Sequence, residues 1–249
     1  SVLADKPLCM KMSDIKLLRN AIEGRNAALF LYLTERYNPS VYTLFDLVEK
    51  GAIGQVVSFT SFRPHKLMAD ARPDWFWHRD TNGGILVDLT IHDVDIFCKL
   101  TKANIREIYA THGNVANPSH PEFEDVGHML LKADKGINGM FRADWLTPKG
   151  EKMHGDCRYF VVGTQGWAEV FTTGGLGENT VLSPRIVTDT TPATHVPLMH
   201  PQTTILADFV AAVRGEKPSI SAEEVLRASE LVLLAREAAD TNMPIQGGS

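Results

Sequence analysis

An aspartate and a histidine lie four residues apart in the string Asp88-Leu-Thr-Ile-His92, and a lysine stands near the start of the chain in Asp5-Lys6-Pro7. On a helix, residues four apart share one face. If a helix begins near Asp88, both side chains lie in its first turn, at the positive end of the helix dipole. Such a pair suits a histidine that takes a proton and a carboxylate that orients it or supports its charge. Lys6 is the candidate third member of this site.

The first 35 residues have the pattern of a strand, a helix and a second strand. Residues 1–3 read as the end of a strand, and the apolar spacing of Ile15, Leu18 and Ile22 predicts a helix with one buried face. The run 27–33 is almost wholly apolar, which is typical of a strand buried on both faces of a parallel sheet. We therefore interpret residues 1–35 as a remnant of a doubly wound α/β domain.

Residues 36–246 are predicted to form an α+β domain with a large, open and mostly antiparallel sheet. Pro39 begins a helix, and Ser221-x-x-Glu224 is a capping box that begins the last one. A β-rich run covers 56–62, and further strands are expected at about 105–113, 125–132, 137–145, 156–163, 166–172 and 180–187. Short turns between consecutive strands favour antiparallel pairing. The closing helices are expected to pack back on residues 1–35, and residues 247–249 resemble a linker scar.

An open sheet with one uncovered face usually pairs with a partner. We therefore expect a homodimer or homotetramer that forms through this face.

Composition narrows the class of protein. The chain has 249 residues, of which 44% are hydrophobic and 22% charged, and its net charge of −5 comes without any basic run. This balance argues against nucleic acid as a partner, and no apolar stretch approaches the ~18 residues that a membrane span needs. The three cysteines are odd in number and widely spaced, which fits a reducing compartment. We expect a cytoplasmic protein that binds neither membrane nor nucleic acid.

Several strings together resemble one family, the glucose–fructose oxidoreductase / inositol dehydrogenase / MocA (Gfo/Idh/MocA) oxidoreductases. Asp5-Lys6-Pro7-Leu8 looks like the family's "EKP" motif, with Asp in place of Glu. Gly83-Gly84-x-Leu86-x-Asp88-x-x-x-His92-x-x-Asp95 looks like the glycine-rich approach to its active-site helix, with two glycines where a third is common. Further similar strings occur at 36–39, 162–166 and 208–218.

The resemblance implies a Rossmann domain, NAD or NADP as cofactor, and hydride transfer to or from a sugar, sugar acid or polyol such as inositol. It implies that His92 takes the hydroxyl proton, that Asp88 holds the imidazole and the substrate, and that Lys6 favours the alkoxide-like charge. The family's first strand, glycine loop and ribose-binding acid are expected to precede Ser1, and no G-x-G-x-x-G is present in the chain.

The candidate site residues fall into three groups. The catalytic candidates are Lys6, Asp88 and His92. The cofactor-binding candidates are Asp5, Lys6, Pro7 and Arg36. The substrate-binding candidates are Lys6, Tyr37, Asn38, Arg63, Trp75, His78, Asp88 and His92.

Position along the chain supports several of these candidates. Arg36, Tyr37 and Asn38 directly follow a buried strand, at the edge where open α/β sheets bind ligands. Trp75 and His78 lie in a long loop, and aromatic rings suit the apolar face of a sugar. By contrast, we expect Asp95 to be structural and to fix a neighbouring group.

Two alternatives remain open. Asp88, His92 and Asp95, with His65 or His78, could ligate a divalent ion in a sugar isomerase or hydrolase, although no HxH or HExxH occurs and we expect no metal. The other alternative is a non-catalytic assembly protein. Bound nicotinamide would favour the dehydrogenase, and a metal-dependent activity would favour the metal enzyme. A stable oligomer with neither property would favour the assembly protein.

Overall fold

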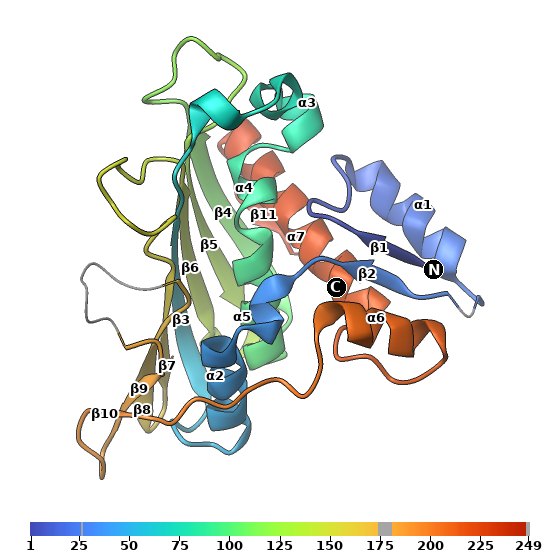
Figure 1. Cartoon of the computed structure of the whole chain (residues 1–249). Helices are drawn as coiled ribbons and strands as arrows, with labels where there is room; N and C mark the ends of the chain where they lie inside the picture. The colour runs from blue at the N-terminus through green and yellow to red at the C-terminus, as the bar shows by residue number, and fades with distance from the viewer. Residues whose placement is uncertain (26, 174–180, 248–249) are drawn as a thin grey trace.

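The computed structural model describes residues 1–25, 27–173 and 181–247, which form two separate sheets (Figure 1). A two-stranded parallel sheet holds β1 and β2, and a nine-stranded sheet has the order β10-β9-β8-β7-β3-β6-β5-β4-β11. In the large sheet β3 and β6 are parallel, and the other neighbouring strands are antiparallel. The expected α/β and α+β architecture with a large, mostly antiparallel sheet is therefore confirmed.

The helices and strands follow the chain in this order. The first elements are β1 (Val2–Ala4), α1 (Met12–Ile22), β2 (Leu29–Leu31), the 3-10 turn η1 (Thr34–Tyr37), α2 (Pro39–Glu49), β3 (Val56–Pro64), η2 (Ala69–Ala71), η3 (Asp74–Trp77), α3 (Arg79–Asn82), α4 (Ile85–Asp88) and α5 (Ile91–Thr101). The remaining elements are β4 (Ile105–Gly113), β5 (Val126–Ala133), η4 (Asp134–Gly136), β6 (Asn138–Asp144), β7 (Arg158–Gly163), β8 (Gly166–Phe171), β9 (Arg185–Thr188), β10 (Thr194–His195), α6 (Ile205–Val213), α7 (Ala222–Thr241) and β11 (Ile245–Gln246).

The N-terminal unit is joined to the rest of the chain by packing and not by strand pairing. Strand β1 pairs with β2 alone, and helices α6 and α7 pack beside them (Figure 1). The rings of Phe30 on β2 and Phe209 on α6 meet edge to face, with centroids 5.5 Å apart. The contacts of α6 and α7 thus tie this unit to the end of the chain. That residues 1–35 are the remnant of a dinucleotide-binding domain stays a prediction.

The main core lies between the large sheet and the helices on its inner face, α4, α5 and α7 (Figure 1). Strand β3 alternates buried and less buried positions, as a strand with one covered face should. Phe59 on β3 packs against Phe97 of α5, Phe141 of β6 and Tyr159 of β7, with ring centroids 5.4–5.7 Å apart. These four rings fix the distance between α5 and the sheet.

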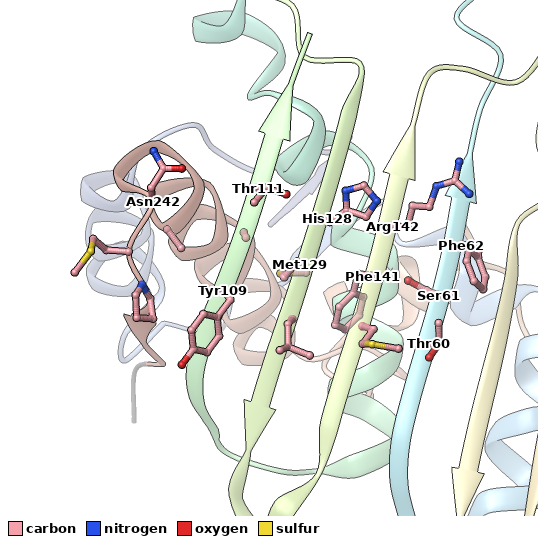
Figure 2. A pocket seen from close by; sticks show the side chains of 16 residues that line it. Thr60, Ser61, Phe62, Tyr109, Thr111, His128, Met129, Phe141, Arg142 and Asn242 are labelled. Atoms are coloured by element: carbon pink, nitrogen blue, oxygen red, sulfur yellow. The ribbon is translucent and has the colours of Figure 1, made fainter. Parts of the chain in front are cut away.

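Among the described elements, no helix packs on the outer face of β4, β5 and β6 (Figure 1). Figure 2 shows side chains on these strands, among them Tyr109, His128 and Arg142. Met140 lies on β6 between the buried neighbours Gly139 and Phe141, and it is 51% exposed. A shallow cavity of about 610 Å³ lies on this face, lined among others by Tyr109, His128 and Met140. It contains none of the candidate catalytic residues.

The described elements depart from the sequence predictions at the C-terminal strands. The strand expected at 180–187 is β9, which begins only at Arg185, and residue 180 lies outside the described residues. Strands β10 and β11 were not predicted, because two residues carry no alternating pattern. The backbone of Gly247 donates to the carbonyl of Arg106 at 2.9 Å, so this residue continues the edge that β11 forms. Residues 248 and 249 of the suggested linker lie outside the described residues.

No helix in the described ranges combines the length and the hydropathy that crossing a bilayer requires.

A buried ion pair ties helix α5 to the N-terminal half. Arg36 in η1 donates through Nε and Nη2 to the two carboxylate oxygens of Asp95, at 2.7 and 2.6 Å. Its Nη1 donates to Glu224, the residue that completes the capping box of α7, at 3.0 Å. The side chains of Arg36 and Asp95 are only 4% and 2% exposed. Asp95 therefore fixes a neighbouring side chain, as expected for a structural role.

Replacing Asp95 by Ala should destabilise the protein by about 3–5 kcal/mol, because it leaves the buried Arg36 guanidinium without its main partner. Lys50→Ala is the control, since it removes an exposed ion pair with Asp46 on α2 and should cost only about 0.3–0.5 kcal/mol. Urea unfolding measures both changes. Equal costs for the two variants would contradict the structural role of Asp95.

Candidate active site

Two consecutive glycines bring the chain to the site in a conformation that other residues rarely adopt. Gly83 and Gly84 have φ angles of +88° and +79°. The carboxylate of Glu124 accepts a hydrogen bond from the backbone of Ile85 at 3.0 Å, at the start of α4. A Cβ on Gly84 would lie 2.5 Å from a carboxylate oxygen of Glu124. Glycine at this position is therefore what lets Glu124 approach the start of α4.

Asp88 and His92 lie on two short helices in succession. Asp88 ends α4, whereas His92 is the second residue of α5. The prediction of one helix beginning near Asp88 is therefore wrong. The helical path is interrupted at Thr90, where ψ is −8° and the hydroxyl donates to the carbonyl of Leu86. The hydroxyl competes for a backbone acceptor, a local preference of Ser and Thr that interrupts helices.

Lys6 forms an ion pair with Asp88, although 82 positions separate them in the sequence. Lys6 lies just after β1, and its peptide bond to Pro7 is cis. The side chains of Lys6 and Asp88 are 25% and 11% exposed, so the pair is partly shielded from water. Among the described residues Asp88 is hydrogen-bonded to Lys6, and no hydrogen bond joins it to His92. The fold therefore places the carboxylate of Asp88 next to the ammonium of Lys6.

His92 is a partly buried imidazole beside positive charge. Burial lowers the pKa of His92 well below its usual range, and the charges of Arg63 and Lys6 lower it further. Its Nδ1 atom is buried and has no hydrogen-bond partner in the described part of the chain. A histidine in this setting is neutral near pH 7 and able to accept a proton.

Arg63, at the end of β3, also supports the position of α5. Its Nε and Nη2 donate to one oxygen of Asp93 at 2.8 and 2.6 Å, and Nη2 also contacts the hydroxyl of Tyr159 at 2.6 Å. Nη1 donates to Glu35 at 3.4 Å. Arg63 is 3% exposed, and every nitrogen of its guanidinium already has a protein partner. Its contribution to the site is therefore positive charge near His92.

Arg36, Tyr37 and Asn38, at the end of η1 and the N-cap of α2, bind protein groups. The guanidinium of Arg36 holds Asp95 and Glu224. The hydroxyl of Tyr37 donates to Asp208 of α6 at 2.6 Å. Asn38 caps α2 through the backbone of Ser40 and donates to the carbonyl of Thr172. These side chains join η1 to α5, α6 and the turn after β8. The guanidinium of Arg36 is occupied by protein acceptors, so it has no free donor for the cofactor contact that the sequence predicted.

Trp75 and His78 lie outside the group formed by Lys6, Asp88 and His92. Trp75 is 54% exposed, and its nearest ring is that of Phe76. The imidazole of His78 is exposed and lies 3.2 Å from Glu122 and 3.6 Å from Asp74. Within the described structure, no hydrogen bond, ion pair or ring contact joins Trp75 or His78 to the three catalytic candidates. Their role in substrate binding remains a prediction.

The structure adds His154, which sequence reasoning did not assign to this site, and gives a setting for His65, which was considered only as a metal ligand. The ring of His65, directly after β3, lies 4.6 Å from that of His154 and 5.5 Å from that of Trp145. Burial lowers the pKa of His65 to about 3, and the charges of Arg63, His154 and Lys6 act in the same direction. In the sequence, only the position of His65 at the end of a strand weakly predicts that it belongs to the site. No sequence feature predicts this for His154.

A metal centre has little support in the arrangement of donors. Across residues 1–25, 27–173 and 181–247, no three His, Cys, Asp or Glu side chains are grouped as ligands of one ion. Asp95, one of the residues considered for such a site, is instead held by Arg36.

The amino-acid sequence is similar to one family profile and to two dehydrogenases. The profile of the GFO/IDH/MocA C-terminal domain matches residues 41–169. The scyllo-inositol 2-dehydrogenase (NAD(+)) of Bacillus subtilis (strain 168) is 26% identical over 168 residues, which cover 66% of this chain and 46% of that protein. The myo-inositol 2-dehydrogenase of Thermotoga maritima is 27% identical over 112 residues, 44% of this chain and 31% of that protein. The chain thus spans less than half the length of these two relatives.

Solved structures share the fold across almost the whole chain. A candidate oxidoreductase from Thermotoga maritima superposes with a TM-score of 0.88 at 27% identity, over 97% of this chain and 71% of that one. A levoglucosan dehydrogenase in complex with NADH has a TM-score of 0.81 at 16% identity, over 99% of this chain and 73% of that one. The sequence match and the shared fold show that the chain belongs to the Gfo/Idh/MocA family.

Proposed function

We propose that the chain acts in an NAD(P)-dependent oxidoreductase that transfers a hydride between a nicotinamide and a sugar, sugar acid or polyol. The observation that carries this proposal is the Lys6–Asp88 ion pair beside a neutral, partly buried His92. The names of the relatives, two of them inositol dehydrogenases, support the reaction class.

The residues around Lys6 suit a nicotinamide cofactor. Asp5, Lys6 and Pro7 follow β1, and η1 follows β2, so both segments lie at the carboxyl end of a parallel pair. Ligands bind at that edge in open α/β sheets. Asp5, Lys6 and Pro7 are therefore the residues placed to contact a nicotinamide ring. The guanidinium of Arg36 is instead held by protein carboxylates. A bound NAD or NADP supplies the hydride acceptor or donor.

In the oxidation direction, His92 accepts the proton of the substrate hydroxyl while the hydride leaves the carbon that bears this hydroxyl. A neutral imidazole is required for this step, and burial and neighbouring cations keep His92 neutral. The ammonium of Lys6 stabilises the negative charge that develops on the substrate oxygen. Asp88 holds Lys6 in place and offsets its charge before the substrate binds. In the reverse direction the proton returns from His92 to the oxygen.

Replacing His92 by Ala should lower cofactor-dependent turnover by about 10²–10⁴-fold, because the site loses its general base. The assay follows formation or loss of reduced nicotinamide by the purified chain with a panel of sugars, sugar acids and polyols. His200→Ala is the control, since His200 is exposed and lies outside the site. Turnover of His92→Ala within twofold of the unchanged chain would remove His92 from the mechanism. No turnover in the unchanged chain, together with a stable oligomer, would favour the assembly protein.

We also propose that a second copy of the chain covers the outer sheet face shown in Figure 2. Exposed apolar side chains on neighbouring strands support this, with Met140 51% and Val57 38% exposed. Water-exposed patches of this kind on a sheet favour association.

Sedimentation equilibrium should give a dimer or larger oligomer for the unchanged chain and a smaller species for Met140→Glu, since the new charge would be buried without a partner. Val115→Glu is the matched control, because Val115 is 69% exposed and lies in the loop after β4. A monomeric unchanged chain, or Met140→Glu that assembles as the unchanged chain does, would contradict the proposed interface.

A further inference from the structure

Arg72 is a fixed cation on the loop that follows η2. Its Nε donates to the carbonyl of Leu67 at 2.7 Å. The guanidinium carbon lies 4.2 Å from the ring centre of Phe76 and 4.8 Å from that of Trp145. Two aromatic rings and a backbone carbonyl therefore hold the side chain in one orientation, so little conformational freedom remains to be lost when it binds a ligand.

The charge of Arg72 has no paired carboxylate. No aspartate or glutamate of the described residues lies within 4.0 Å of its guanidinium, and Nη1 and Nη2 donate to none of the described protein acceptors. Burial lowers the pKa of Arg72, and the charge of Asp88 acts against that effect. Arg72 thus lies close enough to Asp88 for the carboxylate to affect its pKa. The ion-pair partner of Asp88 is Lys6.

The surroundings of Arg72 add positive or neutral groups. Lys66 donates to the backbone carbonyl of Glu151 and forms no ion pair with a described carboxylate. The charges of Arg72 and Lys66 both lower the pKa of His154, although burial is the larger cause. His65, next to His154, is held neutral as described above. Lys66 therefore adds a second positive charge near Arg72.

We propose that Arg72 binds a carboxylate of the substrate, so that the substrate is a polyhydroxylated carboxylic acid, such as a uronic or aldonic acid, and not a neutral sugar or cyclitol. The inference rests on the proposed dehydrogenase function and narrows its substrate class. The free edge of the guanidinium carries two parallel N–H donors, which match the two oxygens of a carboxylate. A neutral polyol would leave this oriented and partly desolvated cation without a counter-charge.

Binding is measured by titration calorimetry of the whole chain, with and without NAD⁺. The ligands are D-glucuronate, D-galacturonate and D-gluconate, the matched neutral compounds D-glucose, D-galactose and myo-inositol, and D-glucose 6-phosphate. At least one sugar acid should bind about tenfold or more tightly than its neutral counterpart, because hydrogen bonds between ionised groups are roughly twice as strong as those between neutral groups.

Two variants and one control isolate the side chain. Arg72→Gln should remove the preference for the acid and leave affinity for the neutral sugar unchanged. Arg72→Lys should retain part of the preference, since it keeps the charge and loses the paired donors. Arg106→Gln changes the net charge by the same amount at an exposed position, with 64% side-chain exposure, and should behave as the unchanged chain.

The outcomes separate this proposal from the proposed reaction. Equal affinity for acids and neutral sugars, no binding of any sugar acid, or an undiminished preference in Arg72→Gln would overturn the role of Arg72. Binding of the sugar phosphate alone would overturn the carboxylate assignment. A preference that Arg72→Gln abolishes would support the site even if no nicotinamide-dependent turnover were found. Turnover of neutral polyols in preference to the matched sugar acids by the unchanged chain would keep the dehydrogenase and reject the inference.

Discussion

Two buried arginine–aspartate pairs on helix α5 determine where His92, the proposed catalytic base, lies. Asp93 is held by Arg63 from β3, and Asp95 is held by Arg36 from η1. Side chains one and three positions from His92 are thus anchored in the sheet and in the N-terminal half. Because successive helical residues point in directions about 100° apart, fixing these two carboxylates also fixes the direction of His92.

The same ion pairs shape the electrostatics of the site. Arg63 is neutralised locally by Asp93, yet its charge still acts on His92, as does that of Lys6. Breaking a buried pair leaves an uncompensated charge, so the arrangement is strongly coupled to folding. The result is a neutral base beside cations that can stabilise an anionic substrate oxygen. In the proposed mechanism, function depends on ion pairs between protein side chains that hold His92 in place.

Local sequence patterns predicted much of this protein and missed the contacts between distant segments. The capping box of α7, the sheet strands and the family could be predicted, because short patterns carry them. That Lys6 shares a site with Asp88 rested on the family resemblance, and their ion pair was not predicted, since no local rule links residues 82 positions apart. The setting of His65 and Arg72 could not be predicted, because it arises only when loops after different strands meet.

The most direct test of this account is an NMR titration of the His92 ring, assigned by comparison with the spectrum of His92→Gln. The account predicts that the ring is still neutral when the pH is lowered from 8 to 6.5, because burial and the charges of Arg63 and Lys6 lower its pKa well below the usual 6.5. A ring that becomes protonated near pH 6.5 would contradict the account. It would mean that His92 is solvated and not held as a neutral base among cations.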